Sequence, residues 1–231
     1  MAKLKYLDLR QAVIDTCLRM NEEGINQGTS GNVSVRTPEG FLITASGIPY
    51  GRMKPEHVVE MDLDGGYIGE YLPSTEWRMH LDIFKHRPEA GAIVHTHSTY
   101  ATAWAQSLRD IPIFGTTHAD HNTVDIPCAS PMDDAMIAGN YEYETGFQIM
   151  NCFKEKGLSY EEVEMMIVGN HAPFTWGKDG NKAVYNAAVL EQVAKMAWLT
   201  EQINPHAPRL KEALIKKHYE RKHGPDSYYG Q

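Results

Sequence analysis

The chain has 231 residues, of which 42% are hydrophobic and 23% charged, a composition that fits one large α/β domain with a buried core. Its formal net charge of −8 argues against nucleic acid or an anionic membrane surface as a general partner. Three widely spaced cysteines do not make a disulfide framework or a thiolate zinc cluster. Because we find neither a signal peptide nor an apolar run near the roughly 18–20 residues of a membrane span, we expect a cytoplasmic protein.

Hydrophobic spacing and turn residues predict helices and strands that interleave along the chain. In chain order, the pattern predicts a helix over 6–23, a strand over 40–46, a helix over 74–87 that Pro88 stops, a strand over 91–97, a helix over 100–107, two strands over 164–170 and 172–177, and a long helix over 181–203 that Asp179 could cap. The alternation is not the regular βαβ pattern of a nucleotide-binding sheet. We therefore predict a mixed α/β fold with one domain over residues 1–231.

Two histidines, His95 and His97, stand two apart in the strand predicted over 91–97. On a strand, such side chains point to the same face, where two imidazoles can bind one cation. Zinc takes about four ligands and keeps one position open in catalytic sites. His171, at a turn between strands, and Glu76, at a helix start, could complete the set. The alternative is that both are core histidines satisfied by the backbone, because H-x-H spacing is common.

Small polar residues recur in three predicted turns of the first 75 residues. The segment "NQGTSGN" (26–32) could form a nest of backbone N–H groups, "ASG" (45–47) offers a second turn, and Ser74 and Thr75 lie at a helix start that favours an anion. The Gly-Lys-Ser/Thr ending of a Walker loop is missing. Each segment alone could be an ordinary turn or cap. Together they make a phosphate site plausible.

The C-terminal segment "KKHYERKHGPDSYYGQ" (216–231) is basic and also contains aromatic residues. A charge run of this kind is usually a solvated tail. Disordered segments, however, are poor in aromatic residues, so this segment could instead dock on another subunit.

Eight motifs, in order, resemble those of the class II sugar-phosphate aldolase and epimerase family: "GTSGNVSVR", "ITASGIPY", "PSTEW", "IVHTHSTYATAWAQ", "IPIFGTTHAD", "IPC", "NHAPFTWGKD" and "RKHGPDSYYGQ". From about residue 91 onward the chain looks closest to the L-ribulose-5-phosphate 4-epimerases. The first 80 residues look more like the L-fuculose-1-phosphate aldolases, and Glu76 stands where the epimerases have Asp. The aldolases, in turn, have a Tyr where this chain has Thr116.

The resemblance implies a mixed sheet flanked by helices and a set of site residues. It implies that Zn²⁺, or another divalent cation such as Mn²⁺ or Co²⁺, is bound by Glu76, His95, His97 and His171. In the aldolases the residue at position 76 also carries a proton during turnover. The positions that match phosphate-binding residues of the family are Asn32, Ser46, Gly47, Ser74 and Thr75.

The resemblance also implies how the reaction is run and how the protein assembles. Asp120 and Tyr229 match the acid/base pair of the epimerases, and Thr116, His218 and Arg221 match supporting positions. The tail, from about 205 to 231, would reach the active site of a neighbouring subunit in a homotetramer. The implied substrate is a phosphorylated ketose, in pentose phosphate and arabinose catabolism.

Three functions follow as alternatives. The resemblance favours a zinc-dependent L-ribulose-5-phosphate 4-epimerase, an isomerase that cleaves and re-forms the C3–C4 bond. The second is an aldolase of the L-fuculose-1-phosphate type, a carbon–carbon lyase. The third is a non-catalytic binding module like the adducin heads, which have no need to keep a metal set.

Overall fold

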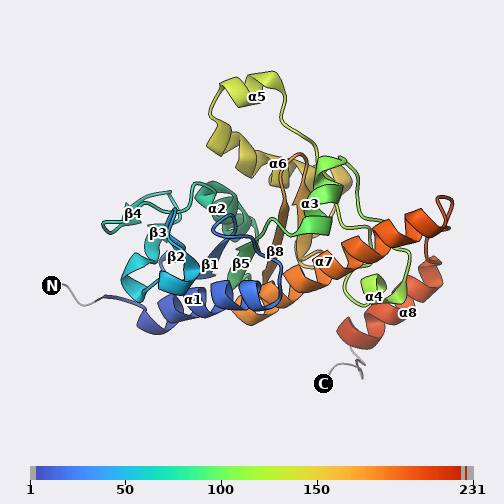
Figure 1. Ribbon diagram of the computed structural model, residues 1–231, viewed down its shortest axis with the longest axis horizontal. Helices are drawn as coiled ribbons and strands as arrows, with labels where there is room; N and C mark the ends of the chain where they lie inside the picture. Colours follow the sequence, from blue (N-terminus) through green and yellow to red (C-terminus); the bar gives the residue numbers. More distant parts are fainter. Residues whose placement is uncertain (1–3, 225–226, 228–231) are drawn as a thin grey trace.

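The computed structural model describes residues 4–224 and 227, which form a mixed α/β fold around one sheet (Figure 1). The strands are β1 Asn32–Arg36, β2 Gly40–Ile43, β3 Val59–Asp62, β4 Tyr67–Ile68, β5 Ala92–His95, β6 Cys128–Ala129, β7 Met165–Val168 and β8 Pro173–Gly177. The helices are α1 Leu7–Glu22, α2 Trp77–His86, α3 Thr99–Gln106, α4 Thr116–Ala119, α5 Asp134–Ala138, α6 Tyr141–Lys156, α7 Gly180–Ile203 and α8 Glu212–His223. Two short 3₁₀ helices, η1 Tyr50–Arg52 and η2 Pro55–His57, precede β3.

The eight strands form one sheet in the order β4-β3-β2-β1-β5-β8-β7-β6. Neighbouring strands are antiparallel except β6 and β7, which are parallel. The strands β1, β5 and β8 therefore lie side by side at the centre, although they are far apart in the sequence. In the register of this centre, His95 at the end of β5 pairs with Asn32 and with Phe174.

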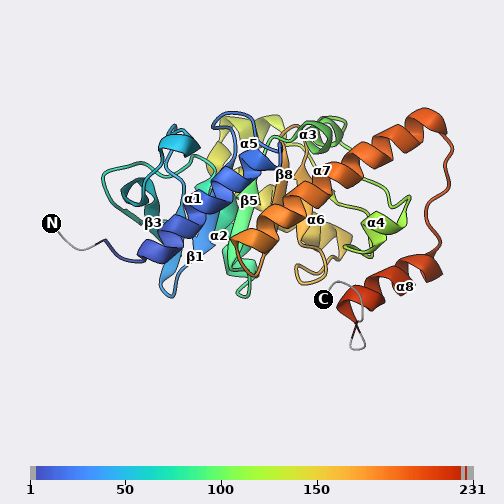
Figure 2. The same ribbon diagram turned by 60° about the horizontal axis from the view of Figure 1, so that its bottom comes forward.

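Helices cover both faces of the sheet. On one face α1 and α7 lie side by side (Figure 2), over a core to which β5 contributes Ala92 and Val94. On the other face α2 packs against α6 over a core that includes Ile93 and Trp176. This alternation along β5 places His95 on the same side as Ile93, the side on which α2 lies.

The predicted helices over 6–23, 74–87 and 181–203 are confirmed with shifts of a few residues at their ends. The side chain of Asp179 caps α7 as expected, because it accepts a hydrogen bond from the backbone N–H of Lys182. The predicted strand over 91–97 is too long at its C-terminal end, since β5 stops at His95. In the described part of the chain, every helix is either too short or too polar to span a bilayer.

Candidate metal centre and active site

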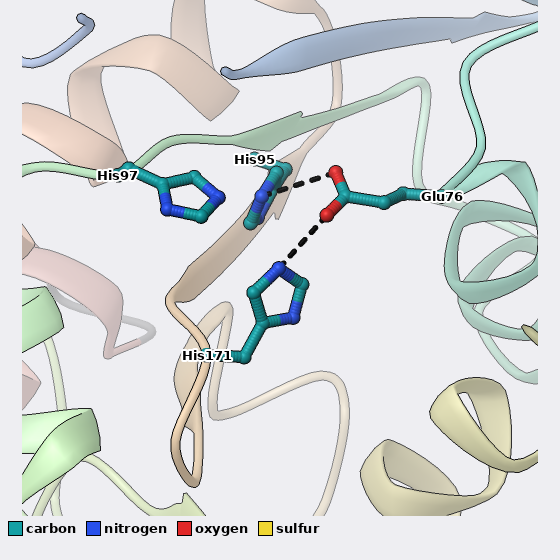
Figure 3. A group of neighbouring side chains, drawn as sticks. All are labelled: Glu76, His95, His97 and His171. Carbon is teal, nitrogen blue, oxygen red and sulfur yellow. Dashed lines mark ion pairs between the residues drawn. The ribbon is translucent and has the colours of Figure 1, made fainter. Parts of the chain in front are cut away.

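Glu76, His95, His97 and His171 converge on one point beside the central strands (Figure 3). One potential ligand atom from each lies within 4.8 Å of the others. The two carboxylate oxygens of Glu76 are divided between two histidines: Oε1 lies 2.8 Å from His171 Nε2, and Oε2 lies 3.1 Å from His95 Nε2. The structure thus brings together all four residues expected to bind a metal.

Each of the four residues comes from a different local setting. His95 is the last residue of β5, and His171 lies in the turn between β7 and β8, where Asn170 adopts a left-handed conformation with φ of 59°. Glu76 is the residue before the first turn of α2. His97 lies two residues beyond the strand, in the link to α3, and it meets His95 at the same cluster, as the spacing of two predicted. The two rings approach to 4.9 Å between centroids.

The hydrogen bonding of His95 tests whether a cation fits here. Its Nδ1 lies 2.9 Å from the carbonyl oxygen of Pro173, so Nδ1 carries the hydrogen and the neutral ring has a lone pair on Nε2. That Nε2 is buried and has no hydrogen-bond partner among the described residues. A lone pair 3.1 Å from a carboxylate oxygen is repelled unless a proton or a cation lies between them. Three imidazoles and one carboxylate are a donor set that suits a divalent metal such as zinc.

The electrostatics of the site favour an ionised carboxylate at Glu76 and a neutral ring at His97, as metal binding requires. Burial acts to raise the pKa of Glu76, but the charges and hydrogen bonds of His95 and His171 outweigh it and hold that pKa below its usual range. Burial, with the charges of His95 and His171, lowers the pKa of His97 to about 4.

A polar pocket of about 300 Å³ adjoins the metal centre. Glu76 and His97 lie at one side of it, and it is also lined by the five residues expected to bind phosphate: Asn32, Ser46, Gly47, Ser74 and Thr75. The backbone N–H groups of Ser46 and Ser74 donate to Leu72 and Thr44, so these two residues can offer only their hydroxyls to an anion. Gly47 has φ of 73°, which glycine adopts without strain.

Asn32 has a second contact that the sequence analysis did not predict, since its side-chain Nδ2 donates to Glu76 Oε2. Behind it, His80 lies 2.5 Å from Asn32 Oδ1. The spacing of four residues between Glu76 and His80 on one helix was a usable signal, because it places both side chains on the same face of α2.

Asp120, the other residue expected to act in proton transfer, belongs to a separate cluster. It directly follows α4, and its Oδ1 lies 2.9 Å from His218 Nδ1 and 3.0 Å from Arg221 Nη2, both on α8 of the same chain. Burial acts to raise the pKa of Asp120, but His218 and Arg221 outweigh it and lower that pKa. Thr116 begins α4.

This cluster lies at one end of the molecule, away from β3 and β4 (Figures 1 and 2), and Asp120 does not line the pocket beside Glu76. Tyr229 lies outside the described residues. The expectation that the tail serves a neighbouring subunit stays a prediction. Within the described residues, His218 and Arg221 hold the Asp120 of their own chain.

Comparison with known proteins identifies the family. The family described as "Class II Aldolase and Adducin N-terminal domain" matches residues 11–198, so the chain belongs to it. The L-ribulose-5-phosphate 4-epimerases UlaF of Salmonella paratyphi C and Salmonella choleraesuis are each 42% identical over 226 residues, which cover 96% of this chain and 98% of each relative. The resemblance found in the sequence is confirmed, and these relatives support an enzyme, an isomerase or an aldolase.

Solved structures confirm the fold. An L-fuculose 1-phosphate aldolase superposes with a TM-score of 0.80 at 24% identity, covering 96% of this chain and 99% of that one. The L-fuculose-1-phosphate aldolase of Thermus thermophilus gives a TM-score of 0.69 at 23% identity, over 87% of this chain and 98% of that one. The single-domain mixed α/β fold is therefore that of the class II aldolases.

Proposed function

We propose that this chain is a zinc-dependent L-ribulose-5-phosphate 4-epimerase, which converts its substrate to D-xylulose 5-phosphate. The observation that carries the proposal is the convergence of Glu76, His95, His97 and His171, with the buried His95 Nε2 directed at the Glu76 carboxylate. The 42% identity to named epimerases, over 96% of the chain, supports this substrate over others of the family.

The chemistry explains why an epimerase needs such a site. C4 of a 2-ketopentose is not adjacent to the carbonyl, so a carbanion formed there has no enolate to delocalise into. Cleaving the C3–C4 bond by a retro-aldol step avoids that problem, because the electron pair left on C3 is delocalised through C2 onto the carbonyl oxygen. A bound metal ion would supply Lewis-acid stabilisation of this charge. The side chains that would hold it are Glu76, His95, His97 and His171.

The remaining residues hold the fragments and move the proton. The pocket with Asn32, Ser46 and Ser74 would hold the phosphate of the departing aldehyde fragment, so that the fragment can turn without escaping. Two acid/base groups are needed, because a proton leaves one face and returns from the other. The lowered pKa of Asp120 keeps this carboxylate ionised, which is the form that a base requires, and Tyr229 would be its partner.

The assembly we propose is a homotetramer with active sites between subunits. Because α8 is joined to Asp120 through His218 and Arg221, a tail that reaches a neighbouring subunit would carry Asp120 to the same place. Asp120, Thr116, His218, Arg221 and Tyr229 would then serve the metal centre of the neighbour.

An aldolase of the L-fuculose-1-phosphate type is the second candidate, because position 76 holds Glu. In that reaction the phosphate sits on the other fragment, the aldehyde leaves, and Glu76 would protonate the enediolate. The same pocket and the same four metal-binding residues would be used.

Incubating zinc-loaded protein separately with L-ribulose 5-phosphate and L-fuculose 1-phosphate, and following the products by NMR, tests the proposal. We expect D-xylulose 5-phosphate without free aldehyde, and loss of this activity in Asp120→Asn with its metal retained. Release of dihydroxyacetone phosphate and lactaldehyde would establish the aldolase instead. Protein that binds no divalent ion and turns over neither substrate would indicate a binding module.

A further inference from the structure

Three buried side chains form a line of hydrogen bonds that ends on the carboxylate of Glu76. His80, on α2, lies with Nδ1 2.6 Å from Ser34 Oγ and with Nε2 2.5 Å from Asn32 Oδ1. Asn32 in turn donates from Nδ2 to Glu76 Oε2. The line therefore ends on the same oxygen that faces His95 in Figure 3.

The chemistry of these groups allows one direction of hydrogen bonding. An ionised carboxylate only accepts, so Asn32 must turn its NH₂ group to Glu76 and its Oδ1 to His80. His80 must then carry its hydrogen on Nε2, which leaves Nδ1 to accept from the Ser34 hydroxyl. Burial, with the charge of His95, lowers the pKa of His80 to about 3, so the ring stays neutral and each nitrogen has one role.

If any of these hydrogen bonds ran in the opposite direction, two acceptor atoms would face each other. If His80 carried its hydrogen on Nδ1, its Nε2 would repel Asn32 Oδ1, and a flipped amide would turn Oδ1 towards Glu76. Bulk water cannot repair such a mismatch, because Asn32, Ser34 and His80 are only 3%, 0% and 0% exposed. The flipped amide would also present an acceptor instead of donors to the pocket that Asn32 lines.

We infer that His80 is a positioning residue of the metal centre: its Nε2–H fixes the amide of Asn32, and through Asn32 it aims the carboxylate of Glu76. The inference rests on the proposed metal site, which His80 does not touch. If the His80 ring only filled space, a side chain of similar shape could replace it. The positioning role instead requires a hydrogen-bond donor at the place of its Nε2.

Titration of the metal-free protein with Co²⁺, followed by the visible absorption of the bound ion, measures affinity and coordination geometry without any activity assay. His80→Leu removes the donor, and we expect it to weaken Co²⁺ binding about 10–100-fold, as loss of a partner that orients a metal ligand usually does, and to alter the absorption spectrum. His80→Gln returns an amide N–H near the position of Nε2, and we expect it to restore most of the affinity. The matched control is His118→Leu, a buried histidine outside the metal centre, which we expect to bind Co²⁺ like the wild type.

Wild-type affinity and spectrum in His80→Leu would overturn the inference, as would a His80→Gln variant as weak as His80→Leu. A wild-type protein that binds no Co²⁺ would overturn the metal site itself, and the role of His80 with it. Should His80→Leu fail to fold, ¹⁵N NMR of the wild-type protein with labelled histidine decides the matter. Hydrogen on Nε2 of His80 supports the inference, and hydrogen on Nδ1 overturns it.

Discussion

The buried imidazole of His118 should make the stability of the folded chain depend on pH. His118 lies on α4, is 5% exposed, and has no hydrogen-bond partner for its Nε2 among the described residues. Burial lowers its pKa to about 4, while an unfolded histidine has a pKa of about 6.5. Between these values the unfolded chain binds a proton that the folded chain does not, so acid favours unfolding there. The contribution is complete above pH 6.5 and is lost as the pH falls towards 4.

The magnitude follows from the two pKa values. Lowering the pH from about 6.5 to about 5 protonates most of the unfolded histidine and little of the folded one, which lowers the free energy of unfolding by about 1.5 kcal/mol, at about 1.36 kcal/mol per pKa unit. His118→Leu should remove this loss. The variant should remain folded at neutral pH, because the side chain lines a cavity with Phe114, Val193 and Ala197.

Urea unfolding of metal-free protein, at one protein concentration and at both pH values, measures the effect through tryptophan fluorescence. Because other buried histidines also contribute to the pH dependence of the wild type, the informative quantity is the difference between wild type and His118→Leu. The exposed His206 supplies the control variant His206→Leu, which should follow the wild type. Equal losses of stability in wild type and His118→Leu would refute the reasoning.

Three other predictions concern the site and the core. His97→Ala should lose metal and activity together, since a site with three remaining ligands rarely holds metal tightly, and wild-type metal content by elemental analysis would contradict the ligand assignment. Tyr229→Phe should keep its fold and metal while steady-state turnover drops by about 10²–10⁴, and an unchanged rate would assign the residue a structural role only. Gly91→Ala should lower the free energy of unfolding by about 1–3 kcal/mol, because the new Cβ would lie 1.9 Å from the backbone oxygen of Lys178. In the same urea experiment the control variant Gly51→Ala should change this free energy little, because its new Cβ would have nothing within 4 Å.

The convergence of Glu76, His95, His97 and His171 could be predicted from the sequence, although β5 is shorter than the strand expected over 91–97. His95 and His97 were expected to meet because strand alternation places them on one face. In the structure His97 lies beyond β5, and its ring still lies 4.9 Å from the ring of His95, between centroids. The residue types and their spacing of two were therefore informative, although β5 ends two residues earlier than predicted.

Contacts between distant segments were not predictable from local pattern. The hydrogen bond between His80 and Asn32 joins α2 to the start of β1. The spacing of hydrophobic residues along the sequence does not indicate which polar side chains from distant segments will lie together in the core. The C-terminal tail was compatible with solvent or with a neighbouring subunit. In the structure its helix α8 contacts Asp120 of the same chain through His218 and Arg221, and the prediction of a role in a neighbouring subunit remains open to test.

The presence of Glu rather than Asp at position 76 is weak evidence for an aldolase. The Glu76 carboxylate reaches His171 with one oxygen and His95 with the other, so the length of Glu matches a binding role without any proton transfer. The same cluster would serve an epimerase and an aldolase alike, because in both reactions a metal ion held there would supply Lewis-acid stabilisation of the charge left by carbon–carbon cleavage. What distinguishes the two reactions is the group that handles the proton at the far side of the substrate. In this chain the residue proposed for that task is Asp120, which His218 and Arg221 hold in an ionised state. On this proposal the α4–α8 cluster, rather than the candidate metal centre, would carry the choice between epimerase and aldolase.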